Sequence, residues 1–250
     1  MAAVRDSHAV YGDALGEVYD LFYRGRGKDF AAEAEWVRRV VRERRPGARS
    51  LLDVACGTGE HLAHLVEHFP DAAGVELSPA MRVAAERKLA ATPVHEADMF
   101  DFDLGRVFDA VCCLTGSIAY AADTAELARV VGAMARHLPV GGVLVIDPWW
   151  SPDTFLDGHI AHDVVEGEGR TVVRLSRSHR IGDLSRHEAH YLAADATGVR
   201  HFSQVQDLTL FPAEDYLAAL AGAGCEPEHL TDVGQPRRGL FVGVRREAGR

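Results

Sequence analysis

Cysteine is scarce in this chain, and the few that occur are not spaced for metal or redox chemistry. The 250 residues include four cysteines, at Cys56, Cys112, Cys113 and Cys225. None forms a CxxC pair, which excludes the zinc-ribbon and dithiol redox motifs that depend on that spacing. Cys112 and Cys113 lie in an apolar run, so the sequence predicts buried free thiols and no metal site.

Long apolar runs are also missing. No stretch approaches the roughly 20 apolar residues that a membrane-spanning helix needs. The segment Met1–Ala9 carries charges and lacks the apolar core of a secretory signal. We therefore expect a soluble, cytoplasmic protein that does not bind a membrane.

Basic residues are in the minority. The chain has 27 Lys and Arg against 37 Asp and Glu, for a formal net charge of −10. Proteins that hold nucleic acid depend on Lys and Arg contacts to phosphate, so we expect no nucleic-acid partner. Hydrophobic residues make up 47% of the sequence, which is enough to bury a core, and the length suits one large domain.

Strand-like and helix-like segments alternate through the first 150 residues. Short apolar runs that lead into glycine or polar residues are typical of buried strands, and apolar residues spaced three and four apart indicate amphipathic helices. The expected strands are 50–55, 72–77, 108–114 and 143–147, and the expected helices are 33–45, 60–69, one from Ser78-Pro79 and 123–138. Strands that alternate with helices form βαβ units, which build a parallel sheet.

The pattern changes after Pro148. Between His162 and Phe211, segments with two-residue alternation, such as 171–178 and 188–193, are separated by turn residues and predict hairpins. A helix over 212–223 and a strand over 239–244 complete the chain. We therefore expect an α/β fold with a Rossmann-like, open, mostly parallel sheet and an antiparallel β addition near the C-terminus.

A glycine-rich turn follows the first strand, in the segment 51–59, LLDVACGTG. Open α/β sheets bind ligands at the carboxyl ends of their strands, where glycines let the backbone approach a ligand closely. A dinucleotide site prefers GxGxxG, but Leu62 occupies the third glycine position here. Glu60 at the following helix start would also face a pyrophosphate. Both features argue against NAD.

The segment 53–59, DVACGTG, resembles the first motif of class I S-adenosylmethionine-dependent methyltransferases. Glu76, at the end of the second strand, resembles the family acid that accepts both ribose hydroxyls. Asp98-Met99, after the third strand, resembles the pair that holds adenine, with the carboxylate on the exocyclic amine and the methionine on the ring. The resemblance implies that S-adenosyl-L-methionine is the cofactor and S-adenosyl-L-homocysteine the product. The implied cofactor contacts are Tyr19, Lys28, Asp53, Ala55, Gly57, Gly59, Glu76, Leu77, Asp98 and Met99.

A closer resemblance extends over most of the chain. It is similar to the N,N-dimethyltransferases that act on TDP-linked 3-amino-3,6-dideoxy sugars in desosamine- and mycaminose-type antibiotic pathways. The segments that carry it are 18–21 VYDL, 25–29 GRGKD, 74–78 GVELS, 98–102 DMFDF, 117–120 SIAY, 147–150 DPWW and 238–243 RGLFVG. The paired tryptophans and the terminal RGLF segment are far more specific than the glycine turn.

The resemblance implies roles for residues at the acceptor end of the site. Tyr120 is the candidate beside the acceptor amine, with Tyr11 nearby, and Tyr11 and Tyr19 belong to a segment that can close over the cofactor. Arg238 is the candidate for the diphosphate, because a guanidinium binds phosphate oxygens with two donors. The further substrate contacts expected are Ser117, Trp149, Trp150, Ser178 and Arg180.

This chain departs from the family pattern at several places. Asp147 replaces the usual Glu before Pro-Trp-Trp, Gly116 and Ala119 replace Ser and Gly, and 235–237 reads QPR where PSG is common. These positions lie near the inferred acceptor pocket, so other acceptors stay open. One alternative is a methyltransferase for another small-molecule amine or hydroxyl. A second is a non-catalytic subunit that binds the cofactor and transfers nothing.

The expected organisation is a single methyltransferase domain over 1–250. Within it we expect an N-terminal helical lid over 1–48, a cofactor-binding core over 49–150, and an antiparallel β addition over the acceptor site at 151–211. A closing helix and strand over 212–250 complete the core. The resemblance also implies a homodimer.

Three histidines, His61, His64 and His68, share one helix face, and we interpret that face as solvated rather than as a metal site.

Overall fold

The computed structural model describes residues 11–247 and contains a seven-stranded central sheet. Its strand order is β10 (Cys225–Gln235), β11 (Gly239–Arg245), β5 (Val143–Ile146), β4 (Ala110–Cys113), β1 (Ser50–Val54), β2 (Asp71–Glu76) and β3 (Val94–Glu96). β3, β2, β1, β4 and β5 run parallel, whereas β11 pairs antiparallel with β5 and with β10. This confirms the predicted class I arrangement of a mostly parallel sheet.

Helices cover both faces of this sheet because successive strand residues point to opposite sides. Leu51 packs with α4 (Phe30–Arg44), α5 (Glu60–Leu65) and α6 (Pro79–Leu89), whereas its neighbour Leu52 packs with α7 (Thr124–Arg136) and α8 (Ala213–Gly222). The central strands β1, β4 and β5 are therefore buried on both faces. That is why the sequence shows them as continuous apolar runs rather than as an alternation.

The helix starts follow from local side-chain capping. Ser78 accepts a hydrogen bond from the Met81 amide, and Pro79 occupies the first helical turn of α6, as the sequence predicts. Asp29 caps α4 in the same way, and Asp123 caps α7. These caps place the helix N-termini beside the strand ends where the site forms.

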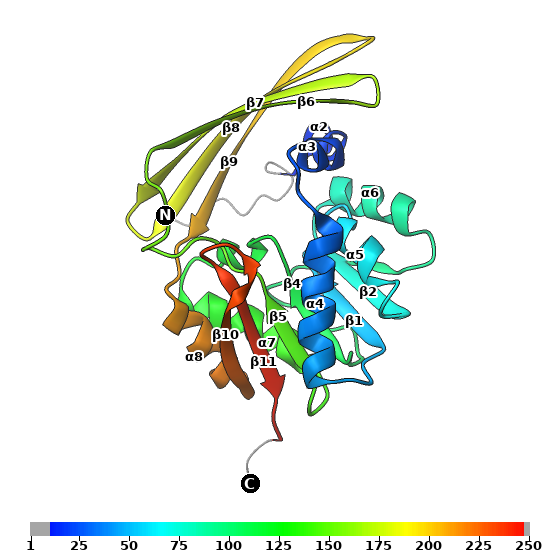
Figure 1. Cartoon of the computed structure of the whole chain (residues 1–250), viewed down its shortest axis with the longest axis vertical. Helices are drawn as coiled ribbons and strands as arrows, with labels where there is room; N and C mark the ends of the chain where they lie inside the picture. Colours follow the sequence, from blue (N-terminus) through cyan, green and yellow to red (C-terminus); the bar gives the residue numbers. More distant parts are fainter. Residues whose placement is uncertain (1–10, 248–250) are drawn as a thin grey trace.

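A second, four-stranded antiparallel sheet lies above the core (Figure 1). It consists of β6 (His159–Gly167), β7 (Arg170–Ile181), β8 (Leu184–Asp195) and β9 (Gly198–Thr209) in that order. The helices α2 (Asp13–Gly16) and α3 (Tyr19–Gly25) lie under it, and Phe22 packs with Tyr191 in their shared core. Gly25 permits this packing, since a Cβ there would collide with the Val165 side chain. The predicted antiparallel addition is confirmed as a separate layer.

The sequence missed the edge strand β10. Its residues CEPEHLTDVGQ lack a clear apolar alternation, and Pro227 argues against a central strand. An edge position removes that conflict, because β10 pairs only with β11 in the sheet. Among residues 11–247, no helix is both long enough and apolar enough to cross a membrane.

Candidate active site

A cavity of about 570 Å³ lies between the carboxyl ends of the parallel strands and the upper sheet. Asp53, Glu76 and Asp98 line it from the core side, where β1, β2 and β3 end. Gln206 and Asp207 line it from β9. The cavity therefore has one end on the parallel core and another on the antiparallel sheet.

The glycine turn after β1 is held by the carboxylate that ends β2. Gly57 adopts a positive φ of 59°, and its amide donates to the Glu76 Oε2 at 2.8 Å. The Ser78 amide donates to the Glu76 Oε1 at 2.7 Å. Burial raises the pKa of Glu76, while these backbone donors oppose the rise. Glu76 therefore fixes the turn and still lines the cavity with its remaining lone pairs.

Asp53 brings a second carboxyl group into the cavity wall. The Cys112 thiol donates to its Oδ1 at 3.6 Å, whereas the buried Oδ2 has no hydrogen-bond partner among residues 11–247. Burial raises the pKa of Asp53 to about 7, and the charge of Glu76 adds to the rise. A buried acceptor without a donor is costly, so this oxygen favours a ligand that donates to it.

A network of ion pairs ties α3 to the glycine turn. The Thr58 hydroxyl donates to the Asp20 Oδ1 at 2.5 Å, and the Lys88 ammonium contacts the Asp20 Oδ2 at 2.7 Å. Glu60 binds both Arg24, at 2.6 Å, and Lys88. Although burial opposes ionisation, Arg24 and Lys88 hold the pKa of Glu60 below its usual value. The N-terminal segment is thereby held against the loop beside the cavity.

Two tyrosine hydroxyls meet at the far end of the cavity. The Tyr120 hydroxyl donates to the Tyr11 hydroxyl at 2.9 Å, although 109 residues separate them in sequence. The Gln206 amide nitrogen donates to Tyr11 at 3.0 Å and to Tyr120 at 2.9 Å. Burial raises the pKa of both phenols above the usual value, so both stay neutral.

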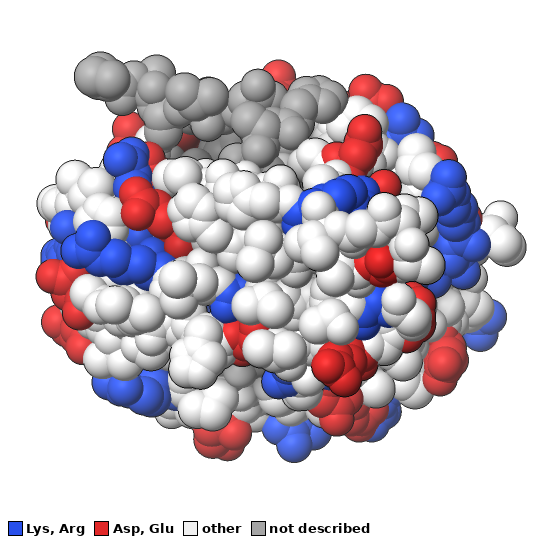
Figure 2. Space-filling view, turned by 90° about the horizontal axis from the view of Figure 1, so that it is seen from above, with Lys and Arg blue, Asp and Glu red and all other residues white. Residues whose placement is uncertain are grey.

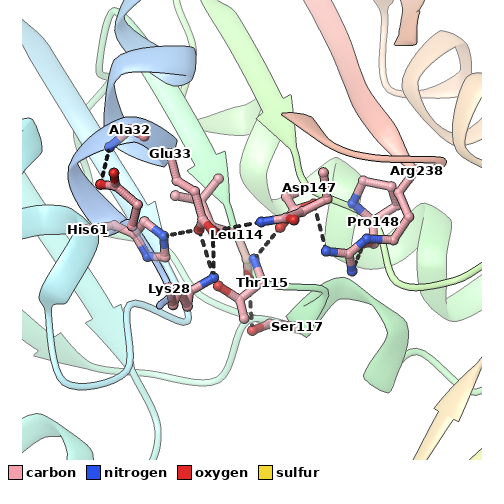
Figure 3. A network of polar contacts seen from close by, with 12 residues as sticks. Lys28, Ala32, Glu33, His61, Leu114, Thr115, Ser117, Asp147, Pro148 and Arg238 are labelled. Atoms are coloured by element: carbon pink, nitrogen blue, oxygen red, sulfur yellow. Dashed lines mark hydrogen bonds and ion pairs between the residues drawn. The ribbon is translucent and has the colours of Figure 1, made fainter. Parts of the chain in front are cut away.

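Arg238 lies in a buried polar cluster next to the end of β5 (Figure 3). Its Nη1 donates to the Pro148 carbonyl at 3.0 Å, and its Nη2 lies 3.9 Å from the Asp147 Oδ1. The guanidinium carbon lies 5.2 Å from the centre of the Trp150 ring. Burial raises the pKa of Asp147, and the positive charge of Arg238 opposes that rise. The Arg238 Nε is buried and has no hydrogen-bond partner in the part of the chain that the structure describes.

Comparison with known proteins places this geometry in a family. The family described as "Methyltransferase domain" matches residues 51–142, which include the glycine turn and Glu76. A dTDP-3-amino-3,4,6-trideoxy-alpha-D-glucopyranose N,N-dimethyltransferase of Streptomyces venezuelae is 51% identical over 229 residues, or 91% of this chain and 96% of that protein. The chain belongs to the family of dTDP-amino-sugar N,N-dimethyltransferases.

Two solved structures of sugar methyltransferases agree with this assignment. The sugar N-methyltransferase KedS8 from Streptoalloteichus sp ATCC 53650 is 94% identical, covers 99% of both chains and superposes with a TM-score of 0.88. CalS10, an amino pentose methyltransferase from Micromonospora echinaspora solved with S-adenosylmethionine bound, is 48% identical. It covers 91% of this chain and 96% of that chain, with a TM-score of 0.83.

S-adenosylmethionine is the cofactor of this methyltransferase, and the residues at the core end of the cavity fit it. The unpartnered Asp53 oxygen suits a ligand that carries hydrogen-bond donors. Glu76 and Asp98 add acceptors, and Met99 and Leu77 add apolar surface for a flat ring. The predicted residues that line the cavity here are Tyr19, Asp53, Ala55, Gly57, Glu76, Leu77, Asp98 and Met99.

Two residues predicted to contact the cofactor lie outside the cavity lining. Gly59 begins α5 with a φ of 76°, and a Cβ there would lie 2.8 Å from the Leu89 Cδ1. Lys28 donates to the Glu33 carboxylate at 2.7 Å (Figure 3). Gly59 thus shapes the turn through close packing, whereas Lys28 is occupied by an internal ion pair. Direct cofactor contact by either residue stays a prediction.

Most residues predicted to contact the substrate also lie outside the lining; Ser117 is the one that lies in it. The Trp149 indole donates to the Ser185 hydroxyl at 2.9 Å, and Trp149 packs against Gly116, whose φ is 74°. The Ser178 hydroxyl pairs with the His187 Nδ1 at 2.9 Å, and the Arg180 Nε donates to the Gly182 carbonyl at 2.8 Å. Substrate contacts by Trp149, Trp150, Ser178, Arg180 and Arg238 therefore stay predictions.

The interpretation of the histidine face as solvated is wrong for His61. Its ring is buried with 6% exposure, and its Nε2 lies 2.6 Å from the Glu33 Oε2. Glu33, on α4, also accepts from Lys28 (Figure 3) and from Gln235 at the end of β10, so this polar cluster covers His61. Helical spacing shows which residues share a face, but it does not show which element packs on it. Among the described residues, no group of three or more potential ligands is arranged for a metal.

The sequence missed the cavity residues from the antiparallel sheet. Gln206 contacts both tyrosines, and Arg186 makes a bidentate ion pair with Asp207 in which both contacts are 2.7 Å. All three residues line the cavity. The only signal in the sequence was the alternation of β9, and alternation does not reveal which residues of a strand reach a site formed by another sheet.

Proposed function

We propose that this methyltransferase transfers two methyl groups, one after the other, from S-adenosylmethionine to the amino group of a TDP-linked amino-deoxysugar. The observation that carries the proposal is the cavity, which joins the acidic cofactor end of the core to the neutral tyrosine pair. The named activity of the Streptomyces venezuelae relative supports the class of acceptor. The amino pentose acted on by CalS10 shows that the family includes more than one sugar.

The bound cofactor supplies an electrophilic methyl group on a sulfonium centre, so the protein contributes position and desolvation. The acceptor amine attacks in its neutral form, having lost its proton to water. Because burial raises the pKa of Tyr11 and Tyr120, both phenols stay protonated and no phenolate is present to act as a base. Their hydroxyls are proposed to hydrogen-bond the amine. Ser117, in the same cavity, is available to contact the sugar.

We propose that the nucleotide portion lies towards Arg238. The buried Nε of Arg238 has no partner, which favours an anionic group that accepts from it. Trp149 and Trp150 flank the guanidinium and offer flat surfaces for a ring. Ser178 and Arg180 lie on β7 of the upper sheet and are proposed to assist at the diphosphate.

The contacts of the N-terminal helix α3 suit a segment that closes over the cofactor. Tyr19 lines the cavity from the start of α3, and the ion pairs of Asp20 and Arg24 hold this helix on the glycine turn. Releasing the spent cofactor between two methyl transfers requires this segment to open and close. Residues 1–10 of the predicted lid over 1–48 lie outside the described residues. We therefore propose that the described part, residues 11–48, acts as a lid over the core, and that the upper sheet within 151–211 covers the acceptor.

The outer face of the upper sheet is proposed to be a homodimer interface. Strand register places exposed apolar side chains on this one face, at Ile160, Val164, Leu175 and Leu192. Seen from above in Figure 2, the middle of the molecule is largely uncharged, with acidic and basic residues intermixed around it. Light scattering in solution reports the oligomeric state directly.

We also propose that the protein acts in the cytoplasm, where its nucleotide-linked substrate would be made.

Mass spectrometry of the protein with S-adenosylmethionine and a panel of TDP-linked amino sugars tests the function. The monomethyl sugar should accumulate first and then decay into the dimethyl product. The same panel includes simple amines and hydroxylated small molecules. Methylation of one of these compounds instead of the sugars would indicate a methyltransferase for another small molecule. Tight cofactor binding without turnover of any compound would instead favour a non-catalytic subunit. A product that stops at one methyl group, with cofactor in excess, would refute the dimethylation.

A further inference from the structure

Three polar groups from distant parts of the chain meet at the acceptor end of the cavity. Tyr11 precedes α2, Tyr120 ends the 3-10 helix η1 (Ser117–Tyr120), and Gln206 belongs to β9. Each of the three side chains lines the cavity. The Tyr11 carbonyl also accepts from the Ser78 hydroxyl at 2.8 Å, which fixes the backbone of Tyr11 beside the start of α6.

The hydrogen bonds of this triad can be counted. A phenol hydroxyl has one proton and two lone pairs, and an amide nitrogen has two protons. Tyr120 gives its proton to Tyr11, and Gln206 donates to each hydroxyl. With respect to the described residues, Tyr120 is left with one free lone pair and Tyr11 with one free proton. Reversing the bond between the hydroxyls only exchanges these roles, so the pair always offers one acceptor and one donor.

We propose that Gln206 is a positioning residue that fixes the tyrosine pair, so that the acceptor amine must donate an N–H to it. We further propose that this requirement ends the reaction after two methyl groups. The inference rests on the proposed function and deepens it. It assigns a role to Gln206, a residue that lies in none of the sequence motifs.

The amine needs its own lone pair for the reaction. That lone pair forms the new N–C bond while the C–S electron pair goes to sulfur, and the positive charge moves to nitrogen. An N–H donated to the free lone pair of Tyr120 holds the amine with its nitrogen lone pair directed elsewhere in the cavity. The methylated ammonium then loses one proton to water before a second transfer. The free proton of Tyr11 is left for an oxygen of the sugar.

The number of N–H groups on the neutral amine sets the limit of two methyl groups. The primary amine has two N–H groups, the monomethyl amine has one, and the dimethyl amine has none. A dimethyl amine can interact with the tyrosine pair only by accepting the free proton of Tyr11. That bond occupies the lone pair that a third transfer would need.

The decisive comparison is Gln206→Met against Gln204→Met. Both glutamines lie on the same face of β9, but Gln204 is absent from the cavity lining. The Gln206 variant should lose about 10- to 100-fold in kcat, because two donated hydrogen bonds disappear. Its affinity for S-adenosylmethionine, measured by calorimetry, and its melting temperature should match those of the control variant.

The product pattern separates positioning from a structural role. A secondary amine has a single N–H and depends more strongly on a fixed partner than a primary amine does. Monomethyl sugar should therefore accumulate to a higher fraction with Gln206→Met than with the wild-type protein. If Gln206→Met matches Gln204→Met in kcat and in product pattern while the wild-type protein is active, the proposal fails. A wild-type protein that methylates no nucleotide-linked amino sugar would overturn the proposed function instead.

A second variant tests the direction of the hydrogen bonds. In Gln206→Glu the protonated acid still donates once, whereas the ionised carboxylate only accepts and would draw the tyrosine protons to itself. The ratio of variant to wild-type kcat/KM should therefore fall as the pH rises. Binding of the unmethylated sugar, measured with S-adenosylhomocysteine present so that no transfer occurs, should weaken over the same pH range. A ratio that does not change with pH would overturn the assignment of Gln206 as the donor.

Discussion

Asp53 makes the stability of the cofactor-free protein depend on pH in an unusual direction. Its carboxyl group is buried, and its Oδ2 has no hydrogen-bond partner. Burial raises the pKa of Asp53 from 3.8 to about 7. Because the folded state holds the proton more tightly than the unfolded state, the contribution of Asp53 to the stability is greatest at low pH. This contribution is lost as the pH rises from about 4 to about 7.

The size of the effect follows from that shift. Each pH unit over which only the folded state keeps the proton costs about 1.4 kcal/mol, so the loss between pH 4 and pH 7 is about 4 kcal/mol. Asp53→Asn has no proton to lose and removes this dependence. Chemical denaturation at pH 5 and at pH 8 should therefore show a larger fall in the free energy of unfolding for the wild-type protein than for the variant.

Asp183→Asn is the matched control, because the Asp183 side chain is 91% exposed and should keep the wild-type pH dependence. Affinity for S-adenosylmethionine should also rise with pH through about 7 in the wild-type protein, since the ionised Asp53 accepts more strongly from a donor. The variant should lose that rise. Identical pH dependence in the wild-type and Asp53→Asn proteins would refute the reasoning.

Two further substitutions test the two ends of the site. Glu76→Ala removes the carboxylate that is proposed to accept from both ribose hydroxyls of the cofactor. Each charge-assisted bond is worth roughly 1.5–3 kcal/mol, so cofactor affinity should fall strongly. Unchanged affinity by calorimetry in a folded variant would contradict the ribose assignment. Arg238→Ala should raise the KM for the nucleotide sugar and leave cofactor affinity nearly unchanged, with a loss of roughly 30- to 150-fold in kcat/KM that Arg238→Lys recovers only in part. A lower melting temperature with unchanged kinetics would instead assign Arg238 a structural role with Asp147.

Family-level knowledge of this protein came from local sequence patterns. The glycine turn after β1, the acid that ends β2 and the Asp98-Met99 pair are each a few residues long. The first two lie at the ends of β1 and β2, which are buried and recognisable as apolar runs, whereas β3 before Asp98-Met99 is short and largely exposed. The carboxyl ends of parallel strands necessarily meet at one edge of a sheet, so these residues converge without any further information. The cofactor end of the cavity was therefore predictable.

The acceptor end was predictable only in part. Tyr11 and Tyr120 were expected there from the resemblance, but their direct hydrogen bond and their contact with Gln206 were not. In a strand, side chains alternate between the two faces, and a shift of one residue in register would turn Gln206 away from the tyrosines. Register in β9 is set by its pairing with β8 along twelve residues and by the way the upper sheet sits on the core. No pattern within 198–209 contains that information.

Burial of charged groups was likewise decided by tertiary packing. Helical spacing placed His61, His64 and His68 on one face, but only the packing of α4 brought Glu33 against His61. The same packing leaves Lys28 bound to Glu33, and the position of the β10–β11 hairpin leaves Arg238 beside Asp147. The sequence by itself determined the parallel core and its cofactor end, because those depend on contacts between neighbours along the chain and on strand ends that must coincide. The tertiary structure alone decided which distant side chains share a hydrogen bond, because that depends on the register and docking of whole elements.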